Sequence, residues 1–548
     1  MFSLQGIFNR KPDHPLFNTR EARRLLAELP KGDPFKELEE TISWLDSLKD
    51  TTGFSPEART EIIILIDETM QPIYAELLRL YLGEPHLQDF KGKHLWQCLH
   101  NAMQILAEAY LVCVQEYQHS EHKSFDYKEL IPLVCVRLMH AVAEQMKLQL
   151  MHYVDIGQAV WDHLCNCYNF AESNRIDDRM VIAYPKHVFH VSPQRELVRA
   201  LMLYESSPGA LAPDQIEVVS RIAARMSGFF DFKNAPDPEC AYCFDLANPG
   251  APRRMDENIL VAPAMRFFGA IKAVPKVADI IAQHEHGLIQ KEQRFGSEFT
   301  PAGKLTVLKH LRLHWGNDRP RRHLERRGVS TAIGVIHSFR MISKLVTRMD
   351  IDNAVNISEI DAAILKKRSS INLAAENDEI DYFTEKWIVT DLSVDGIGGI
   401  IPHNCGVWVK IGDLCGLKAE KSPVWWIGMI RRLHADAKGS IHAGIEMLAK
   451  KPLSVWLRTL GKESEKVLHW ETSSGSFNYD YLPAILLPDA SNSYANATML
   501  MESGSYAPET IYEVMLGDKS RNIKLAELLA EGEDYEQIRF QWLNAAHA

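Results

Sequence analysis

The stretch Arg321-Arg-His-Leu-Glu-Arg326 stands at the point where the character of the chain changes. Before it, apolar residues recur at steps of three and four, which is typical of amphipathic helices. After it, short apolar runs alternate with turn residues, which favours β-strands. We therefore expect a multidomain α + β protein whose helical and β regions meet at this arginine-rich segment.

Strand-like runs follow the arginines at short intervals, with turn residues between them. This spacing suits a small antiparallel barrel over residues 316–455. The expected strands are 329–336, 387–391, 407–411, 425–431 and 441–447. Further strands at 481–487, 497–502, 510–516 and from Ile538 predict a C-terminal β-rich unit at 456–548. The sequence leaves open whether that unit folds separately or completes the barrel.

Residues 1–315 predict a large α-helical domain of one or two subdomains. A stripe of apolar residues between 94 and 113 would bury one helix face. Helix starts are indicated by a capping residue or alanine followed by proline, because proline suits the first helical position. Such pairs occur at Asp33-Pro34, Ser192-Pro193, Ala212-Pro213 and Thr300-Pro301. A stretch rich in turn residues, 231–256, interrupts the helices.

A second polar motif, Asp391-Leu-Ser-Val-Asp-Gly396, follows one of the expected strands. Taken alone, each motif has an ordinary explanation. Two arginines four residues apart occur at any solvated basic helix end. Asp, Ser and Gly are the commonest residues of a polar β-turn. Their order along the chain, with strands beside them, is more specific than either motif.

In that order the two motifs resemble those of the PilZ domain family. Arg322 and Arg326 match its Arg-x-x-x-Arg motif, and Asp391, Ser393 and Gly396 match its Asp-x-Ser-x-x-Gly motif. The segments Gly406-Val-Trp-Val-Lys-Ile and Gly444-Ile-Glu-Met continue the similarity downstream. The resemblance covers about 316–450 and implies a six-stranded antiparallel β-barrel.

The resemblance also implies a ligand, the bacterial messenger cyclic di-GMP. Arginine suits such a ligand, because its planar guanidinium pairs with phosphate or with guanine and also stacks on purines. In the family, the arginines hold phosphates and guanines while the second motif closes around a guanine. An additional arginine before the first motif tends to accompany an intercalated ligand dimer, and Arg321 occupies that place.

One departure from the family pattern lies between the two motifs. They are separated by 64 residues, 327–390, which is about twice the usual spacing. We assign the excess to an insertion near 345–383. Within it, the segment from Asn356 is expected to form a capped helix.

The composition limits other functions. A formal net charge of -11 disfavours bulk nucleic-acid binding, which depends on neutralising phosphates. No apolar stretch reaches the ~18–20 residues that cross a bilayer. The N-terminus lacks the pattern of a secretory signal. These features predict a cytoplasmic protein with no membrane span.

Metal sites and enzymes find little support in the motifs. The pairs Cys165/Cys167 and Cys240/Cys243 could form the two halves of a zinc site, but buried free thiols are favoured. Histidine pairs at 119/122, 284/286 and 310/314 lack a partnering motif. There is no phosphate-cradling glycine loop or nucleophile elbow. We expect no catalysis, no metal and no cofactor.

Two functions remain. The first is a cyclic di-GMP receptor that binds at the barrel through Arg321, Arg322, Arg326, Asp391, Ser393 and Gly396 and signals through the helical domain to an unidentified protein partner. The alternative is a helical interaction scaffold whose PilZ-like barrel no longer binds ligand. The complete motif set favours the receptor.

Overall fold

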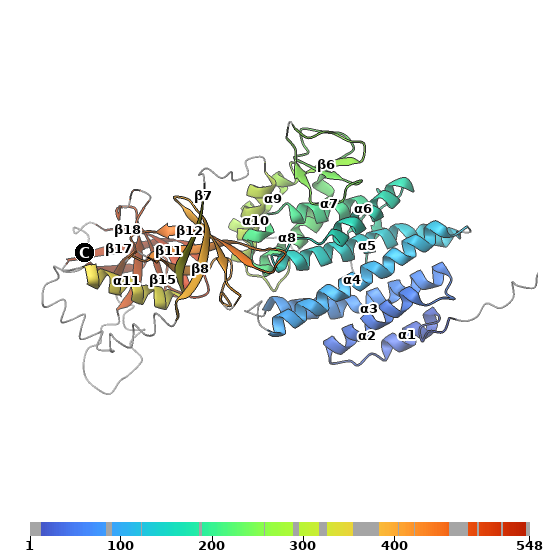
Figure 1. Cartoon of the computed structure of the whole chain (residues 1–548), viewed down its shortest axis with the longest axis horizontal. Helices are drawn as coiled ribbons and strands as arrows, with labels where there is room; N and C mark the ends of the chain where they lie inside the picture. Colours follow the sequence, from blue (N-terminus) through green and yellow to red (C-terminus); the bar gives the residue numbers. More distant parts are fainter. Residues whose placement is uncertain are drawn as a thin grey trace, which may run out of the picture. The chain divides into compact units, whose positions relative to one another are not determined.

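The computed structural model divides the chain into two compact units, residues 1–321 and 322–548. The first unit is mostly helical and the second is mostly β-structure (Figure 1). The structure describes residues 12–83, 90–121, 123–185, 189–256, 258–288, 295–316, 326–353, 383–403, 405–420, 422, 424–459, 481–489, 491, 493–516 and 519–543.

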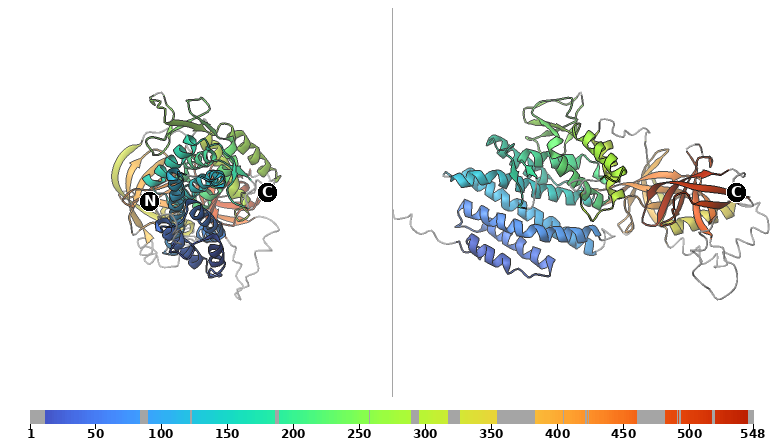
Figure 2. Two further views of the ribbon diagram at one scale, coloured as in Figure 1. Left: turned by 90° about the vertical axis from the view of Figure 1, so that its right-hand side faces the viewer. Right: turned by 180° about the vertical axis from the view of Figure 1, so that it is seen from behind.

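In the helical unit, α3, α4 and α5 are long and pack side by side (Figures 1 and 2). The helices are α1 (Thr19–Ala27), α2 (Pro34–Asp50), α3 (Pro56–Gly83), α4 (Phe90–His119), α5 (Phe125–Met151), α6 (Gln158–Ser173), α7 (Pro193–Tyr204), α8 (Pro213–Met226), α9 (Ala273–Glu285) and α10 (Pro301–Trp315). None of the described helices is both long and apolar enough to cross a membrane.

The predicted helix starts are confirmed, and each uses the expected chemistry. Asp33 and Ser192 accept hydrogen bonds from backbone amides in the first turns of α2 and α7, at 3.3 Å in both cases. Thr300 caps α10 by accepting from Gly303 at 3.1 Å. At α8 the amide of Ala212 donates to Gln215 Oε1 at 3.0 Å. Proline follows the cap in all four helices, where its missing amide costs no hydrogen bond.

Small sheets accompany the helices, and the sequence did not indicate them. A two-stranded ribbon joins β1 (Val181–Ile182) to β2 (His190–Val191). A four-stranded antiparallel sheet has the order β3-β6-β4-β5. Its strands are β3 (Asp231–Lys233), β4 (Tyr242–Asp245), β5 (Arg253–Arg254) and β6 (Met265–Gly269). Three of these strands, β3, β4 and β5, lie within the turn-rich stretch 231–256. The stretch can hold them because each strand is at most four residues long.

The second unit begins with a closed antiparallel barrel in the order β10-β11-β12-β9-β8-β7. Alternate side chains point inward, as the pleat of a strand requires, so Val335, Trp387, Val389, Ile397 and Ile445 are buried. The strands are β7 (Arg327–His337), β8 (Glu385–Leu392), β9 (Gly396–Ile401), β10 (Leu414–Ala419), β11 (Trp426–Ala435) and β12 (Ile441–Ala449). The predicted six-stranded barrel is confirmed.

Two details of the strand prediction are wrong. Residues 407–411 form a loop, and the strands β9 and β10 on either side were not predicted. Gly406 directly precedes these residues with a φ of +74°, and its amide donates to the Glu385 carboxylate at 3.0 Å. The Trp408 indole also donates to Glu385, at 3.0 Å, and stacks on His337 with ring centres 4.6 Å apart. Trp408 therefore packs onto the barrel without joining its ladder, whereas the neighbouring Val407 is exposed.

The C-terminal β-rich region forms a second closed antiparallel barrel, in the order β13-β14-β15-β18-β17-β16. Its first strand begins at Leu453, three residues before the expected start of the C-terminal unit at 456. The strands are β13 (Leu453–Thr459), β14 (Leu482–Leu487), β15 (Thr498–Glu502), β16 (Ile511–Leu516), β17 (Lys519–Glu531) and β18 (Tyr535–Trp542). The helical region and the two barrels together confirm the predicted fold class.

A helix, α11 (Phe339–Asn353), packs against both barrels and joins their cores. Its Phe339, Ile342 and Val346 share one apolar cluster with Met429 of the first barrel and Leu500 of the second. Both ends of the helix are tied to the second barrel. The Phe339 amide donates to Asp534 at 2.5 Å, and Asp350 accepts from the Ser454 amide at 2.7 Å.

The expected insertion near 345–383 therefore begins inside α11. That part of it is a packed helix with a buried face. The helix predicted from Asn356 lies outside the described residues, as does the rest of 354–382.

Candidate ligand-binding site

Arg326 and Asp391 form an ion pair on the outside of the first barrel. Arg326 immediately precedes β7, and Asp391 is the penultimate residue of β8. The two strands pair with Gly328 opposite Asp391, so the start of one strand meets the end of the other. About a third of each side chain remains exposed, 33% for Arg326 and 31% for Asp391. Both groups are therefore accessible to a ligand.

The turn between β8 and β9 completes the second motif. The Ser393 amide donates to the Gly396 carbonyl at 2.8 Å, and the Ser393 hydroxyl donates to the same oxygen at 3.2 Å. A Cβ on Gly396 would lie 3.6 Å from Ser393 Oγ and 3.9 Å from an Arg326 guanidinium nitrogen. It would also lie 3.0 Å from the Ile445 carbonyl, closer than most real contacts. The structure thus brings Arg326, Asp391, Ser393 and Gly396 together.

The other two predicted arginines cannot be placed. Arg321 and Arg322 lie outside the described residues. Arg322 is four residues before Arg326 in the same segment. Their contribution to the site stays a prediction.

Neighbouring residues that the sequence did not single out support the turn. Gly398 pairs directly with Asp391 across β8 and β9. The Asp395 carbonyl accepts from the Met447 amide at 2.9 Å, and the Val394 carbonyl accepts from Lys450 Nζ at 2.9 Å. The repeated glycines of Gly396-Ile-Gly-Gly399 are the feature of the sequence that could have indicated this close approach of backbone and side chains. Their role depends on strand register, which only the folded barrel supplies.

Gly398 leaves room for the Asp391 carboxylate, and this yields a test. In Gly398→Ala the new Cβ would clash with Asp391 Oδ2, so the carboxylate must move away from Arg326. If the ligand binds here, we expect cyclic di-GMP affinity to fall about tenfold, the loss of one charged hydrogen bond. The matched control is Gly399→Ala, whose Cβ meets its nearest neighbour, the Ile388 carbonyl, at 3.4 Å. If wild type and Gly398→Ala bind cyclic di-GMP with equal affinity in a calorimetric titration, Asp391 does not contribute to the ligand site.

The arrangement suits recognition of a phosphate or a purine. A guanidinium can pair with two phosphate oxygens at once, and a carboxylate accepts hydrogen bonds from the N1 and N2 edge of guanine. In the absence of ligand these two groups neutralise one another. A ligand with both chemical groups could replace the single ion pair with two sets of charged hydrogen bonds.

The cysteine pairs do not come together as a metal site. Cys165 and Cys167 lie on α6, where their thiols face the backbone carbonyls of Asp245 at 3.9 Å and Cys135 at 3.6 Å. Burial raises the pKa of Cys165 to about 12 and that of Cys240 to about 11, so both thiols remain protonated at neutral pH. Across the described ranges, no group of three metal-ligating side chains is assembled.

Histidines of two of the predicted pairs make local contacts. His310 Nε2 is 2.7 Å from the Ser206 carbonyl, and its ring packs on His314 with centres 4.2 Å apart. His119 Nδ1 is 2.7 Å from the Gln115 carbonyl of its own helix. Its predicted companion, His122, lies outside the described residues.

Comparison with known families identifies both ends of the chain. Residues 20–237 match the family model described as "Cyclic-di-GMP receptor FimW, N-terminal domain". Residues 471–543 match the model described as "FimW C-terminal beta-barrel domain". No curated protein matches the chain. The region between the two matches, 238–470, contains the first barrel and the whole candidate site. Both models describe parts of one receptor family, and the description of the first model names cyclic di-GMP.

Proposed function

We propose, on the premise that both ends of the chain match one cyclic di-GMP receptor family, that this protein binds the dinucleotide on its first barrel. The observation that carries the proposal is the convergence of Arg326, Asp391, Ser393 and Gly396 at the β8–β9 turn. The resemblance to PilZ suggests the same four residues, with Arg321 and Arg322 ahead of them.

The ligand would act by exchanging partners. In the free protein Arg326 is held by Asp391. A bound phosphate draws the guanidinium away, and the carboxylate then accepts from guanine. Arg321 and Arg322 supply further cations from the segment that enters β7. If Arg321 acts as its counterpart does in the family, the site holds two intercalated ligand molecules.

Signal output is assigned to the helical unit. In the sequence, the Arg-x-x-x-Arg motif follows directly on the end of the first compact unit, since that unit ends at Arg321 and the second begins at Arg322. A ligand shifts a conformational equilibrium by its differential affinity for two states. A ligand held by Arg321, Arg322 and Arg326 would therefore change the states available to the helices and to a protein partner that they bind. Because cyclic di-GMP is an intracellular messenger, we assign the receptor to the cytoplasm.

A calorimetric titration of cyclic di-GMP into wild type and Arg322→Ala tests the function. We expect micromolar or tighter binding in wild type and at least a ~100-fold loss in the variant, since two charged hydrogen bonds disappear. A stoichiometry of two ligands per chain would support the role of Arg321. No heat in wild type would favour the alternative function, a helical scaffold with an inactive barrel.

A further inference from the structure

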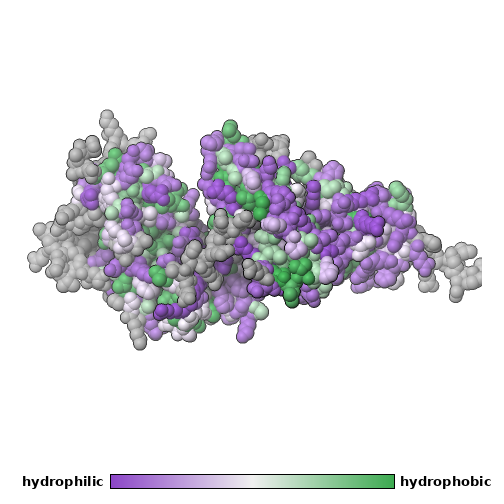
Figure 3. Space-filling view, turned by 90° about the horizontal axis from the view of Figure 1, so that it is seen from above, coloured by the Kyte–Doolittle hydropathy of each residue, from purple (hydrophilic) through white to green (hydrophobic). Residues whose placement is uncertain are grey.

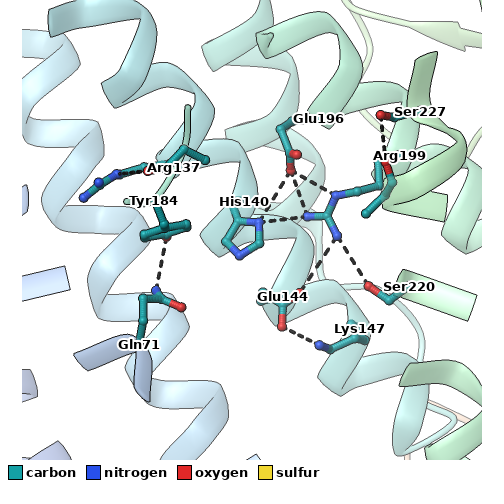
Figure 4. Close-up of polar contacts among 12 residues, drawn as sticks. Gln71, Arg137, His140, Glu144, Lys147, Tyr184, Glu196, Arg199, Ser220 and Ser227 are labelled. Carbon is teal, nitrogen blue, oxygen red and sulfur yellow. Dashed lines mark hydrogen bonds and ion pairs between the residues drawn. The ribbon is translucent and has the colours of Figure 1, made fainter. Parts of the chain in front are cut away.

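Apolar side chains gather only in small patches on the face of the molecule that Figure 3 shows. An apolar ligand would be buried better in a cavity than on such a face. A cavity of about 570 Å³ lies in the helical unit, but its charges neutralise one another. Arg199 pairs with Glu196 at 2.9 Å, and Lys147 pairs with Glu144, as Figure 4 shows. These groups already have partners, so this cavity offers no charge to a ligand.

A different cavity, of about 430 Å³, lies at one mouth of the second barrel. Leu453 begins β13 and pairs with Leu486 near the end of β14, and Trp542 ends β18. Because neighbouring strands run antiparallel, these positions meet at the same end of the barrel. The volume suits a small molecule, and barrel mouths are common places for such sites. The lining residues are Leu453, Leu486, Tyr494, Ala495, Arg521 and Trp542.

The floor of this cavity is the apolar core of the barrel. Leu486 is fully buried in that core, and Leu453, Tyr494 and Trp542 pack against it. The Trp542 indole donates to the Tyr494 carbonyl at 3.1 Å, and the Tyr494 hydroxyl donates to the Lys451 carbonyl at 2.8 Å. The polar atoms of both aromatic side chains are therefore satisfied by the backbone, and their rings are left as apolar surface.

Arg521 is the one charged residue in the described lining. Ile523 and Leu525, two and four residues further along β17, are fully buried in the core. Because side chains alternate along a strand, Arg521 shares their inward face at the open end of the barrel. Its guanidinium carbon lies 4.9 Å from the centre of the Trp542 ring. Within the described ranges, no carboxylate pairs with this guanidinium.

An inward cation at the mouth of an apolar barrel favours an anion that carries an apolar chain. One guanidinium balances one negative charge, and its planar fork matches the two oxygens of a carboxylate. The apolar walls would bury an aliphatic chain. Asp489, the acid of the adjoining loop, is not part of the lining and already accepts from the amides of Ser491 and Ser493, at 3.0 and 2.9 Å. Charge and shape therefore favour a monocarboxylate.

We propose that the mouth of the second barrel binds a small aliphatic carboxylate. Its carboxylate group pairs with Arg521, and its chain lies against Leu453, Leu486 and the ring of Trp542. The site lies on a different barrel from the one that would hold the dinucleotide. Its occupancy is therefore measurable without cyclic di-GMP, and failure of either proposal leaves the other standing.

The test uses three compounds of one shape and different charge: hexanoate, 1-hexanol and n-hexylamine. Their binding to the full chain is measured by ligand-observed saturation-transfer NMR, which suits weak binding to a 62.3 kDa protein. We expect saturable binding of hexanoate and at least about tenfold weaker binding of the alcohol and the amine, because only the anion gains charged hydrogen bonds from the guanidinium. Equal affinities for all three compounds, or no binding of hexanoate, would overturn the proposal.

Two substitutions localise the carboxylate. Arg521→Gln removes the charge, and its matched control is Arg539→Gln, between the inward residues Ile538 and Phe540 and so on the outer face of the same barrel. Ala495→Trp fills the mouth, and its control is Ala507→Trp, at an exposed alanine of the β15–β16 loop.

The affinity for hexanoate should fall about tenfold or more in Arg521→Gln and in Ala495→Trp, and stay unchanged in the two controls. The weak binding of 1-hexanol should be the same in wild type and Arg521→Gln, because the alcohol does not use the charge. Wild-type affinity for hexanoate in Arg521→Gln would overturn the proposal, and so would equal losses in a cavity variant and its control.

Discussion

The Arg326→Ala variant should lose at least ~100-fold in affinity for cyclic di-GMP while keeping its fold. Arg326 can place two charged hydrogen bonds on one phosphate, each contributing about 1.5 kcal/mol or more, and together these correspond to that factor. The side chain is one-third exposed and its ion pair with Asp391 lies at the surface. Such pairs contribute only about 0–1 kcal/mol to stability, so the melting temperature should hardly change.

The control for Arg326→Ala is Arg539→Ala in the second barrel. Arg539 also pairs with a carboxylate of the adjacent strand, Glu527 at 2.5 Å, and is more exposed, at 58%. Its removal should leave affinity unchanged in the same calorimetric titration. If both variants bind like wild type, the guanidinium of Arg326 does not touch the ligand. If both variants lose affinity equally, the loss reflects the reduced positive charge of the whole protein and not a contact between Arg326 and the ligand.

The largest expected loss of stability follows from Arg137→Met in the helical unit. The side chain of Arg137 is 1% exposed, lies 3.3 Å from fully buried Asp67, and pairs with Glu68 at 2.6 Å. Tyr110 and Gln71 would still donate to Asp67, at 2.6 and 2.7 Å, but without a counter-charge. Removing one partner of a buried pair costs about 3–5 kcal/mol.

Urea unfolding of the full chain, followed by the helical circular dichroism signal, would measure this loss. The matched control is Arg179→Ala, which breaks the surface pair with Glu129, where both side chains are more than two-fifths exposed. The control should cost less than about 1 kcal/mol. Similar midpoints for the two variants would mean that Asp67 finds another cation or takes up a proton.

The sequence predicted the first barrel because its motifs have a fixed order and its inward residues alternate. It missed β9, since the run from Gly396 to Gly399 contains three glycines and resembles a turn. It also assigned 407–411 to a strand. There the alternating apolar residues are typical of a strand, but Gly406 and the carboxylate of Glu385 hold the segment off the ladder.

The candidate site could be predicted only in part, because residue spacing is visible in the sequence and strand register is not. Arg326, Asp391, Ser393 and Gly396 are recognisable by residue type and spacing. Gly398 is not, because its importance comes from the strand opposite, where the Asp391 carboxylate occupies the place of a missing side chain. The buried charges of the helical unit were not predicted either. Glu144 of α5, Glu196 of α7 and Glu217 of α8 lie far apart in the sequence, and each charge taken alone is typical of a solvated helix face.

The position of α11 limits how this protein can be divided or recombined. Its apolar face is covered by residues of both barrels, including Met429 and Leu500. Each large aliphatic side chain left uncovered would forfeit roughly 1.5–3 kcal/mol. A gene fragment ending before Leu453 would therefore encode a first barrel that exposes the apolar face of α11 and is prone to aggregate. In evolution the two barrels should be inherited together as one unit. A ligand that stabilises the first barrel would also affect the second through the shared helix α11.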